Sequence, residues 1–370
     1  MRGVSVFAFG LLLILCFLNT DFPYYVSVQS EPKIEITEIG QVDTVGWAGN
    51  VHVQDDIAYL SDSEGGLYII DVSDPENPTE LSQFTEGIDE LHEIYVDESL
   101  VFLADYTDGF KIIDVSDPTD PMQIGRFHDG GEVGAFDILD DLAFIADFVD
   151  GLEVVNISDP TNPVEITQYD TGISYIFNVG IHNDLAYVSD FVSPTEKALR
   201  VLDISNLSTI EEVAEYTIDG EVFSIDFVGD IAYMMCSYGG VKIFNISNPP
   251  SLNEIGSYYD GGNAVDLEFY DGLAVVADRV DGLEFLNADN LSRITEVEQY
   301  VDGGSASGIE IVNNLMFVAD GENGLEILQI EVLSDNTTTT ESFDFGVLLT
   351  LAGAALLVGL VIVAFWQRAK

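Results

Sequence analysis

Short apolar segments rich in β-branched and aromatic residues recur along most of the chain, separated by Gly, Asp, Asn or Pro. This pattern predicts β-strands joined by tight turns. Between Glu31 and Val332 no stretch sustains the 3.6-residue apolar spacing of an amphipathic helix, so helix is expected only in the terminal segments. Many strands are apolar on both sides, as in Gly66–Asp71, which predicts sheets buried on both faces.

One sequence motif, an apolar strand that in most copies ends in Asp, occurs seven times. The last residues of the seven copies are Asp62, Asp105, Asp147, Asp190, Cys236, Asp278 and Asp320. Successive copies are 42 to 46 residues apart, a period typical of propellers and solenoids. Each unit contains four predicted strands, which in the sixth unit are Val265–Phe269, Leu273–Ala277, Leu283–Leu286 and Ile294–Tyr300. Four strands make one blade, so the sequence predicts an all-β fold, a seven-bladed β-propeller.

The seventh unit is one strand short, because a polar segment follows its third strand, Leu325–Ile330. Near the N-terminus, Ile36–Gln41 resembles the fourth strand Ile294–Gln299 almost residue for residue. We therefore expect this N-terminal strand to complete the last blade, since ring closure removes an exposed sheet edge. A tandem array of β-sandwiches would not need such a strand.

The terminal segments predict a single-pass cell-membrane protein. Residues 1–30 begin with one charge and an apolar run, typical of a signal peptide whose cleavage point is unclear, and an uncleaved anchor is the alternative. Residues 345–366 carry no charge and are long enough to form a transmembrane helix. The basic tail 367–370 is expected in the cytoplasm, which places the propeller, 31–332, and a Thr-rich stalk, 333–344, outside the cell.

The amino-acid composition restricts the kinds of partner that the protein can bind. The chain has 66 acidic residues and 11 Lys and Arg, a net charge of −55, so it cannot neutralise phosphates and nucleic acid is excluded as a natural partner. Only Cys16 and Cys236 are present, and Cys16 lies in the predicted signal, so packing rather than a disulfide must stabilise the domain.

Three third strands with their turns, Leu67–Pro75, Phe110–Pro118 and Leu152–Pro160, resemble the LVIVD repeat of bacterial and archaeal surface proteins. The resemblance covers roughly residues 33–332. Later copies depart from it, with Ser205-Asn206-Leu207 in place of Ser-Asp-Pro. The resemblance implies a propeller at a cell surface, and it brings no common biochemical activity.

Two acidic sets are predicted to rim one mouth of the channel, because alternate loops of a meander share a face. The first joins second to third strands: Asp105, Asp108, Asp147, Asp150, Asp278, Asp281 and Asp320. The second joins each blade to the next: Asp129, Asp170, Asp219, Asp260 and Asp302. Turn formation and solvation explain such residues, while rings of carboxylates near carbonyls also suit Ca²⁺, with no ligand set specified.

Further carboxylates are expected on the innermost strands, where they would point into the channel: Glu93, Asp137, Asp226, Asp266, Glu268 and Glu310. They form either a hydrated channel wall or a ligand site. Five sequons mark candidate glycosylation sites: Asn156, Asn206, Asn245, Asn290 and Asn336. The fourth repeat has a longer loop, Asp190–Arg200, which indicates either a binding insertion or sequence drift.

No nucleophile elbow, phosphate loop or zinc signature is present in the sequence, so no catalytic residue is predicted. The leading interpretation is a binding, adhesion or scaffold module of the cell envelope whose partner is an envelope protein or a glycan. One alternative is a hydrolase or lyase that uses channel carboxylates and a divalent metal. Another is a surface coat protein whose acidity is an adaptation to salt.

Overall fold

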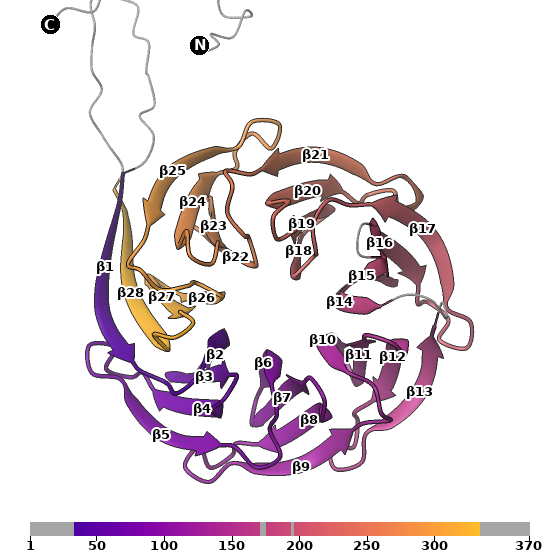
Figure 1. The fold of residues 1–370 in the computed structure, drawn as a ribbon, viewed down its shortest axis with the longest axis horizontal. Coiled ribbons are helices and arrows are strands. Elements are labelled where there is room, and N and C mark those ends of the chain that lie inside the picture. The colour runs from indigo at the N-terminus through magenta and orange to yellow at the C-terminus, as the bar shows by residue number, and fades with distance from the viewer. Residues whose placement is uncertain (1–32, 171–174, 194–195, 334–370) are drawn as a thin grey trace, which may run out of the picture. The chain divides into compact units, whose positions relative to one another are not determined.

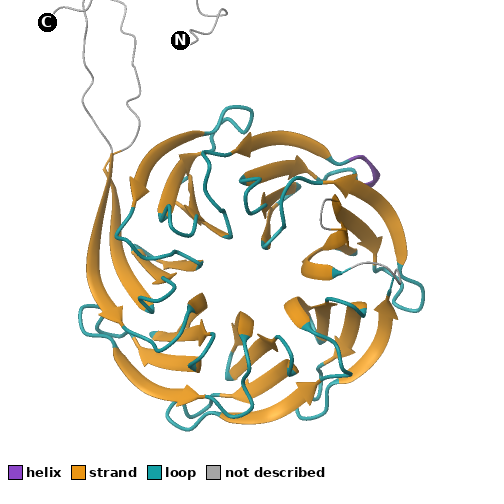
Figure 2. Ribbon diagram, viewed as in Figure 1, coloured by secondary structure: helices purple, strands orange, loops and turns teal. Residues whose placement is uncertain are grey.

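The computed structural model describes residues 33–170, 175–193 and 196–333, which form a ring of seven four-stranded antiparallel sheets (Figure 1). The predicted signal peptide, the transmembrane helix, the cytoplasmic tail and nearly all of the stalk lie outside these residues. Within the described ranges no helix is long and apolar enough to cross a membrane. The helical element found there is one 3₁₀ turn, η1 (Pro249–Ser251), on an otherwise β ring (Figure 2).

The strands run from the channel outward in each blade. The first three blades contain β2 (Ala48–Gln54), β3 (Ile57–Asp62), β4 (Gly66–Asp71) and β5 (Thr79–Phe84); β6 (Leu91–Asp97), β7 (Leu100–Asp105), β8 (Gly109–Asp114) and β9 (Met122–Phe127); β10 (Val133–Leu139), β11 (Leu142–Asp147), β12 (Gly151–Asn156) and β13 (Val164–Tyr169). Blades four to six contain β14 (Ile176–His182), β15 (Leu185–Ser193), β16 (Glu196–Asp203) and β17 (Glu211–Thr217); β18 (Ser224–Val228), β19 (Ile231–Met235), β20 (Val241–Asn245) and β21 (Asn253–Tyr258); β22 (Asp266–Tyr270), β23 (Leu273–Ala277), β24 (Leu283–Asn287) and β25 (Thr295–Tyr300). The seventh blade contains β26 (Gly308–Val312), β27 (Leu315–Ala319), β28 (Leu325–Leu333) and β1 (Lys33–Val42).

The predicted seven-bladed, four-stranded architecture is confirmed. In the sixth blade the observed strands agree with the predicted ones to within one residue at each end. The innermost strands β2, β6, β10, β14, β18, β22 and β26 surround the channel, and the outermost strands form the rim (Figure 1).

Closure by the N-terminal strand is also confirmed. β1 pairs antiparallel with β28 as the fourth strand of the last blade, with Ile36 opposite Ile330. The register shifts between Glu38 and Gly40, a β-bulge in the closing strand. The two ends of the described chain therefore lie side by side in one sheet, where backbone hydrogen bonds hold the ring closed (Figure 1).

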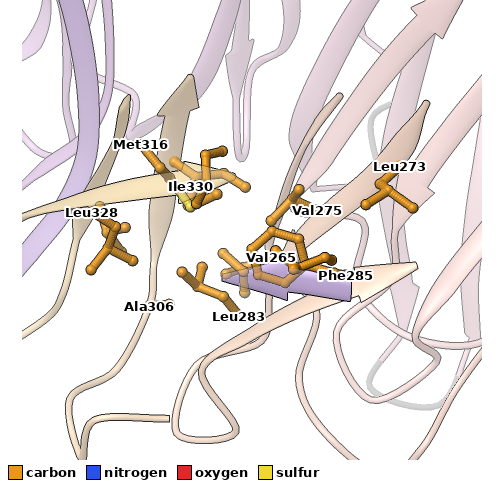
Figure 3. Close-up of a cluster of buried hydrophobic side chains, with 13 residues drawn as sticks. Val265, Leu273, Val275, Leu283, Phe285, Ala306, Met316, Leu328 and Ile330 are labelled. Carbon is orange, nitrogen blue, oxygen red and sulfur yellow. The ribbon is translucent and has the colours of Figure 1, made fainter. Parts of the chain in front are cut away.

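The hydrophobic core is divided into seven clusters, each lying between two adjacent blades. Between blades six and seven, Val265 and Phe285 pack in one cluster with Met316 and Ile330 (Figure 3). Ile34 of the closing strand belongs to the same cluster. This arrangement accounts for strands that are apolar on both sides, because each sheet is covered by a neighbouring blade on either face.

Candidate functional site

The two acidic loop sets lie on the same face of the ring, as predicted. In the third blade, carboxylate oxygens of Asp129, from the linker, and of Asp147 and Asp150, from the loop between β11 and β12, lie within 4.8 Å of one another. We call this face, formed by the linkers between blades and the loops between second and third strands, the acidic mouth.

The Asp that ends the second strand has a structural role in several blades. Oδ2 of Asp62 accepts a hydrogen bond of 3.1 Å from the backbone N of Gly46, in the linker that enters the same blade. Asp105 accepts bonds from Asp89 and Glu90 in the same way, and Asp147 from Glu132. This side chain therefore fixes the preceding linker, which agrees with the interpretation of the motif as turn chemistry.

In the second blade, Asp105 and Asp108 are neutralised by the protein itself. Nζ of Lys111, from β8, lies 2.7 Å from Oδ2 of each carboxylate and also donates to the carbonyl of Gly87. The side chains of Lys111 and Asp105 are completely buried. Arg126 lies 2.5 Å from the other oxygen of Asp108. These two candidate cation ligands thus already surround an ammonium group.

In the sixth and seventh blades a glutamate replaces that lysine, and three carboxylates converge. Oxygens of each group lie within 4.8 Å of one another; the groups are Asp260, Asp278 and Glu284, and Asp302, Asp320 and Glu326. In the third blade Glu153 occupies the lysine position and lies beside Asp129 and Asp147. We call these three groups, in blades three, six and seven, the carboxylate cages.

Two of the three cage glutamates, Glu153 and Glu284, are buried without a hydrogen-bond donor. Glu153 and Glu284 are each 1% exposed, and no donor in the described part of the chain bonds to either oxygen of either side chain. Burial first, and the adjoining carboxylate second, raise the pKa of Glu153 to about 9 and that of Glu284 to about 9. The pKa of Asp260 is lowered as that of Glu284 is raised, as expected for two carboxylates that compete for one proton. At neutral pH each cage therefore needs a proton or a cation.

The remaining cage carboxylates are disfavoured as anions for the same reason. Desolvation, followed by neighbouring acids, raises the pKa of Asp147 to about 6. The pKa of Asp278 and that of Asp320 are also raised to about 6, and that of Glu326 to about 7, with desolvation the largest cause in each. Glu326 differs from the other two glutamates because it accepts a hydrogen bond of 2.8 Å from Tyr300 Oη.

A sequence signal marks these blades. Each of these blades is preceded by an Asp-Gly-Gly linker: Asp129–Gly131, Asp260–Gly262 and Asp302–Gly304. Counted from the Asp of the linker, the loop Asp lies 18 residues further along the chain and the cage Glu lies 24 residues further along. The second glycine is required by space, since a Cβ on Gly131 would overlap the carboxylate of Asp147. Our candidate set lacked the three glutamates because they lie in strands. Asp281, which it included, lies outside the cages found among the described residues.

The channel carboxylates bond to the backbone of the next blade. Oε2 of Glu93 accepts a hydrogen bond of 3.1 Å from Phe136 N, and Oδ2 of Asp137 accepts one of 2.7 Å from Ile181 N. Glu310 accepts one of 2.8 Å from Val53 N across the closing point of the ring. These side chains satisfy donors on the inner edges of the innermost strands, which gives them a structural role.

Asp226 stands apart in the channel. Its Oδ2 accepts a hydrogen bond of 3.3 Å from Ser224 Oγ, and the side chain borders a cavity of about 340 Å³ that Glu93 and Asp137 also line. Burial and the nearby Asp266 raise its pKa well above the usual range.

The basic residues of the fourth-repeat loop form ion pairs with acidic residues of the same protein. Arg200 is buried, with Nη1 2.6 Å from Oε2 of Glu212 and 2.6 Å from Oε2 of Glu215, and Nε bonds Asp190. Lys197 lies 2.5 Å from Glu221 Oε1. Arg200 therefore neutralises its own blade in the way that Lys111 does, and it is not offered to a partner.

Comparison with known proteins decides the family. The LVIVD repeat matches residues 45–86, 92–129, 130–171, 177–218, 219–260 and 303–346. The chain belongs to the LVIVD repeat family. The sixth blade of this LVIVD protein lies between matched repeats, in residues 261–302, yet it folds like the others. No curated protein matches the chain.

Solved structures agree with the fold of this LVIVD protein. It is similar to the β-propeller domain of Cps50 (Swd1) from Myceliophteria thermophila, with 13% identity, a TM-score of 0.64, and 80% of this chain and 99% of that chain covered. It is also similar to the WD40 domain of Neurospora crassa Pan2, with 12% identity, a TM-score of 0.61, and 84% and 98% covered. At these identities the likeness concerns the fold alone.

The sequons of this LVIVD protein that fall in described residues lie on the face opposite the acidic mouth. Asn206 and Asn290 are exposed in turns after third strands, and Asn156 and Asn245 end third strands with partly buried side chains. Asn336 lies outside the described residues. A glycan at the first four positions would leave the acidic mouth uncovered.

Proposed function

We propose that this protein is a non-enzymatic binding module of the cell envelope that captures a partner on its acidic mouth. The observation that carries the proposal is the position of its most exposed apolar side chains. Val45 is 70% exposed, Tyr238 72% and Val280 70%, and all three lie in loops or linkers of this face. Further exposed apolar residues on the same face are Val149, Tyr175, Tyr259 and Val301.

The chemistry of this face indicates the partner. Exposed apolar side chains set among carboxylates suit a protein surface that combines basic and apolar residues. Such a complex would form faster at low salt, because opposite charges steer the encounter. We take an envelope protein as the partner, and a glycan stacked on the exposed tyrosines is the competing outcome.

The proposed location rests on the terminal segments of the sequence. An apolar start, an uncharged stretch at 345–366 and two basic residues after it support a propeller held outside the cell by one C-terminal span. Proteolysis of intact cells tests this orientation. Loss of the propeller from intact cells is the expected result, and protection until the cells are lysed would contradict it.

The channel-based enzyme alternative receives less support. Its principal candidates, Asp137 and Asp266, each accept backbone hydrogen bonds from the next blade, so their positions are explained without a substrate. The solved propellers described above are WD40 or β-propeller domains by name.

The test is affinity capture from the native envelope fraction with the full-length protein as bait. The double variant Tyr238→Ser, Val280→Ser should lose the partner. A matched control, Leu139→Ser with Val228→Ser, changes two exposed apolar residues on the opposite face and should retain it. Equal capture by wild type and both variants would remove the acidic mouth from the binding account.

A further inference from the structure

The second blade of the same ring provides a comparison for the carboxylate cages. Lys111, Glu153, Glu284 and Glu326 occupy one position of the repeat, two residues after the glycine that opens the third strand. In the second blade this position supplies a positive charge between two aspartates, while in blades three, six and seven it supplies a further carboxyl group. The ring thus contains the same site with its own cation and without one.

We propose that each carboxylate cage binds a divalent cation that prefers oxygen ligands, with Ca²⁺ as the ion of matching size, at the place that the Lys111 ammonium occupies in the second blade. The inference goes beyond partner binding, because a bound ion would fix the loops of the acidic mouth whether or not a partner is present.

Geometry and charge both favour a hard cation. Two oxygens that each lie about 2.4 Å from one Ca²⁺ ion can be at most about 4.8 Å apart. The aspartates of the third-blade cage, Asp129, Asp147 and Asp150, meet this limit, as do the three carboxylates in each of blades six and seven. All ligands are oxygens, and Ca²⁺ takes six to eight of them, so water or carbonyl oxygens would complete the shell. Thiolate and imidazole, which would favour other metals, are absent from the three cages.

The unpartnered glutamates distinguish the cages from an ordinary acidic surface. Exposed carboxylates are satisfied by water, but Glu153 and Glu284 are almost fully buried and no donor among the described residues reaches them. A buried carboxylate without a donor or a counter-ion strongly destabilises the folded state, so such a group is normally paired. Asp190 and Arg200 in the fourth blade meet this requirement with a guanidinium group.

A glutamine on the fourth strand supports the loop of each cage, as Gln83 also supports the corresponding loop of the first blade through the carbonyl of Gly65. Nε2 of Gln299 donates 2.9 Å to the carbonyl of Asp281 in the sixth blade, and Nε2 of Gln41 donates 3.1 Å to that of Asn323 in the seventh. Gln168 bonds Asp150 O in the third blade. Each fourth strand therefore holds the cage loop in place, a preorganisation that favours ion binding.

The experiment is a Ca²⁺ titration of the purified full-length protein in 1 M KCl, with bound ions counted by equilibrium dialysis. Wild type should bind three ions at saturation. Glu153→Lys recreates the Lys111 arrangement between Asp147 and Asp150, so it should bind two and should melt at a higher temperature than wild type in chelator. Glu80→Lys makes the same charge change on the exposed outer strand of the first blade, where no cage is found among the described residues, and should still bind three.

A second variant guards against misfolding of the first. Glu284→Gln keeps the shape of the side chain and removes its charge, so it should weaken one of the three ions at least tenfold. The inference is overturned if wild type shows no saturable Ca²⁺ binding under these conditions, which would mean that the cages hold protons. It is equally overturned if Glu153→Lys and Glu80→Lys bind the same number of ions.

Discussion

Oδ2 of Asp266 in β22 accepts a hydrogen bond of 2.8 Å from the backbone N of Ile309 in β26. The other oxygen of the carboxylate accepts one of 2.9 Å from Leu267 N. One channel side chain thus bonds both its own strand and the next blade. Glu93, Asp137 and Glu310 also accept a backbone hydrogen bond from the next blade. These hydrogen bonds link neighbouring blades along the channel wall.

The folded protein should lose stability as the pH rises from about 4 to about 7. Desolvation, with a smaller effect of Glu268, outweighs the two hydrogen bonds and raises the pKa of Asp266 from 3.8 to about 7. Within this window the folded state binds more protons than the unfolded state, so the free energy of unfolding falls with rising pH. Glu310, with its pKa raised to about 7, contributes in the same direction. Urea unfolding in chelator at several pH values measures the slope.

The variant Asp266→Asn removes one titrating group and should make this slope shallower. Asp120→Asn, the same change at an exposed turn, is the matched control and should leave the slope as in wild type. A wild-type stability that rises steadily from pH 4 to pH 7 would contradict the assigned role of the channel carboxylates.

Packing of the closing strand should be essential to stability. Ile34 in β1 is 5% exposed and packs in the cluster between blades six and seven, so Ile34→Ala should cost about 2–4 kcal/mol of unfolding free energy. Ile166→Ala makes the same change where the side chain is 47% exposed on β13, and its cost should stay within about 1 kcal/mol. Chemical denaturation measures both values, and equal costs would show that the N-terminal strand is not needed to complete the core.

The seven blades and the closing strand could be predicted because both depend on local pattern. Every blade repeats the same pattern of four short strands, and Ile36–Gln41 carries the pattern of the missing fourth strand. The cage glutamates could not be found by looking for acidic loops, since Glu153 follows Leu152 inside an apolar strand. An alignment of the seven repeats does mark the cage glutamates, because their position in the third strand is charged in six of the seven units. It holds three Glu, three Lys or Arg, and one Tyr: Tyr68, Lys111, Glu153, Arg200, Lys242, Glu284 and Glu326.

Other features depend on the neighbouring blade and could not be read from one repeat. The sequence places Asp137 on an innermost strand, but its bond to Ile181 requires the position of the fourth blade relative to the third. Likewise the lengthened loop that carries Arg200 suggested a binding insertion, whereas the fold turns this side chain toward Asp190 and Glu212.

Cys236 should be unreactive in the native protein. It takes the place of the loop aspartate in the fifth blade, its side chain is fully buried, and burial raises the pKa of the thiol to about 12. Only the thiolate reacts rapidly, so iodoacetamide at pH 8 should leave the Cys236 peptide unmodified in the folded protein and alkylate it in concentrated guanidinium chloride. Peptide mapping separates it from Cys16, and rapid alkylation of the folded protein would contradict the buried position of this thiol.

The last prediction concerns the glycine that makes room for a cage. An added Cβ at Gly131 would overlap the carboxylate of Asp147, and the backbone there is not in the left-handed region, so the substitution acts through this clash. Gly131→Ala should displace Asp147 from the hydrogen bond donated by Glu132 N and lower the unfolding free energy by about 1–3 kcal/mol.

Gly49→Ala is the matched control, because its Cβ would meet Ser61 Oγ at 3.5 Å, an ordinary contact. Its effect should stay within about 0.5 kcal/mol. Denaturation of both variants in chelator tests the steric argument without any bound ion. If Gly131→Ala were as stable as Gly49→Ala, Asp147 would have room to move, and the third-blade cage would not be the rigid, preorganised group that the spacing of Asp129, Asp147 and Asp150 indicates.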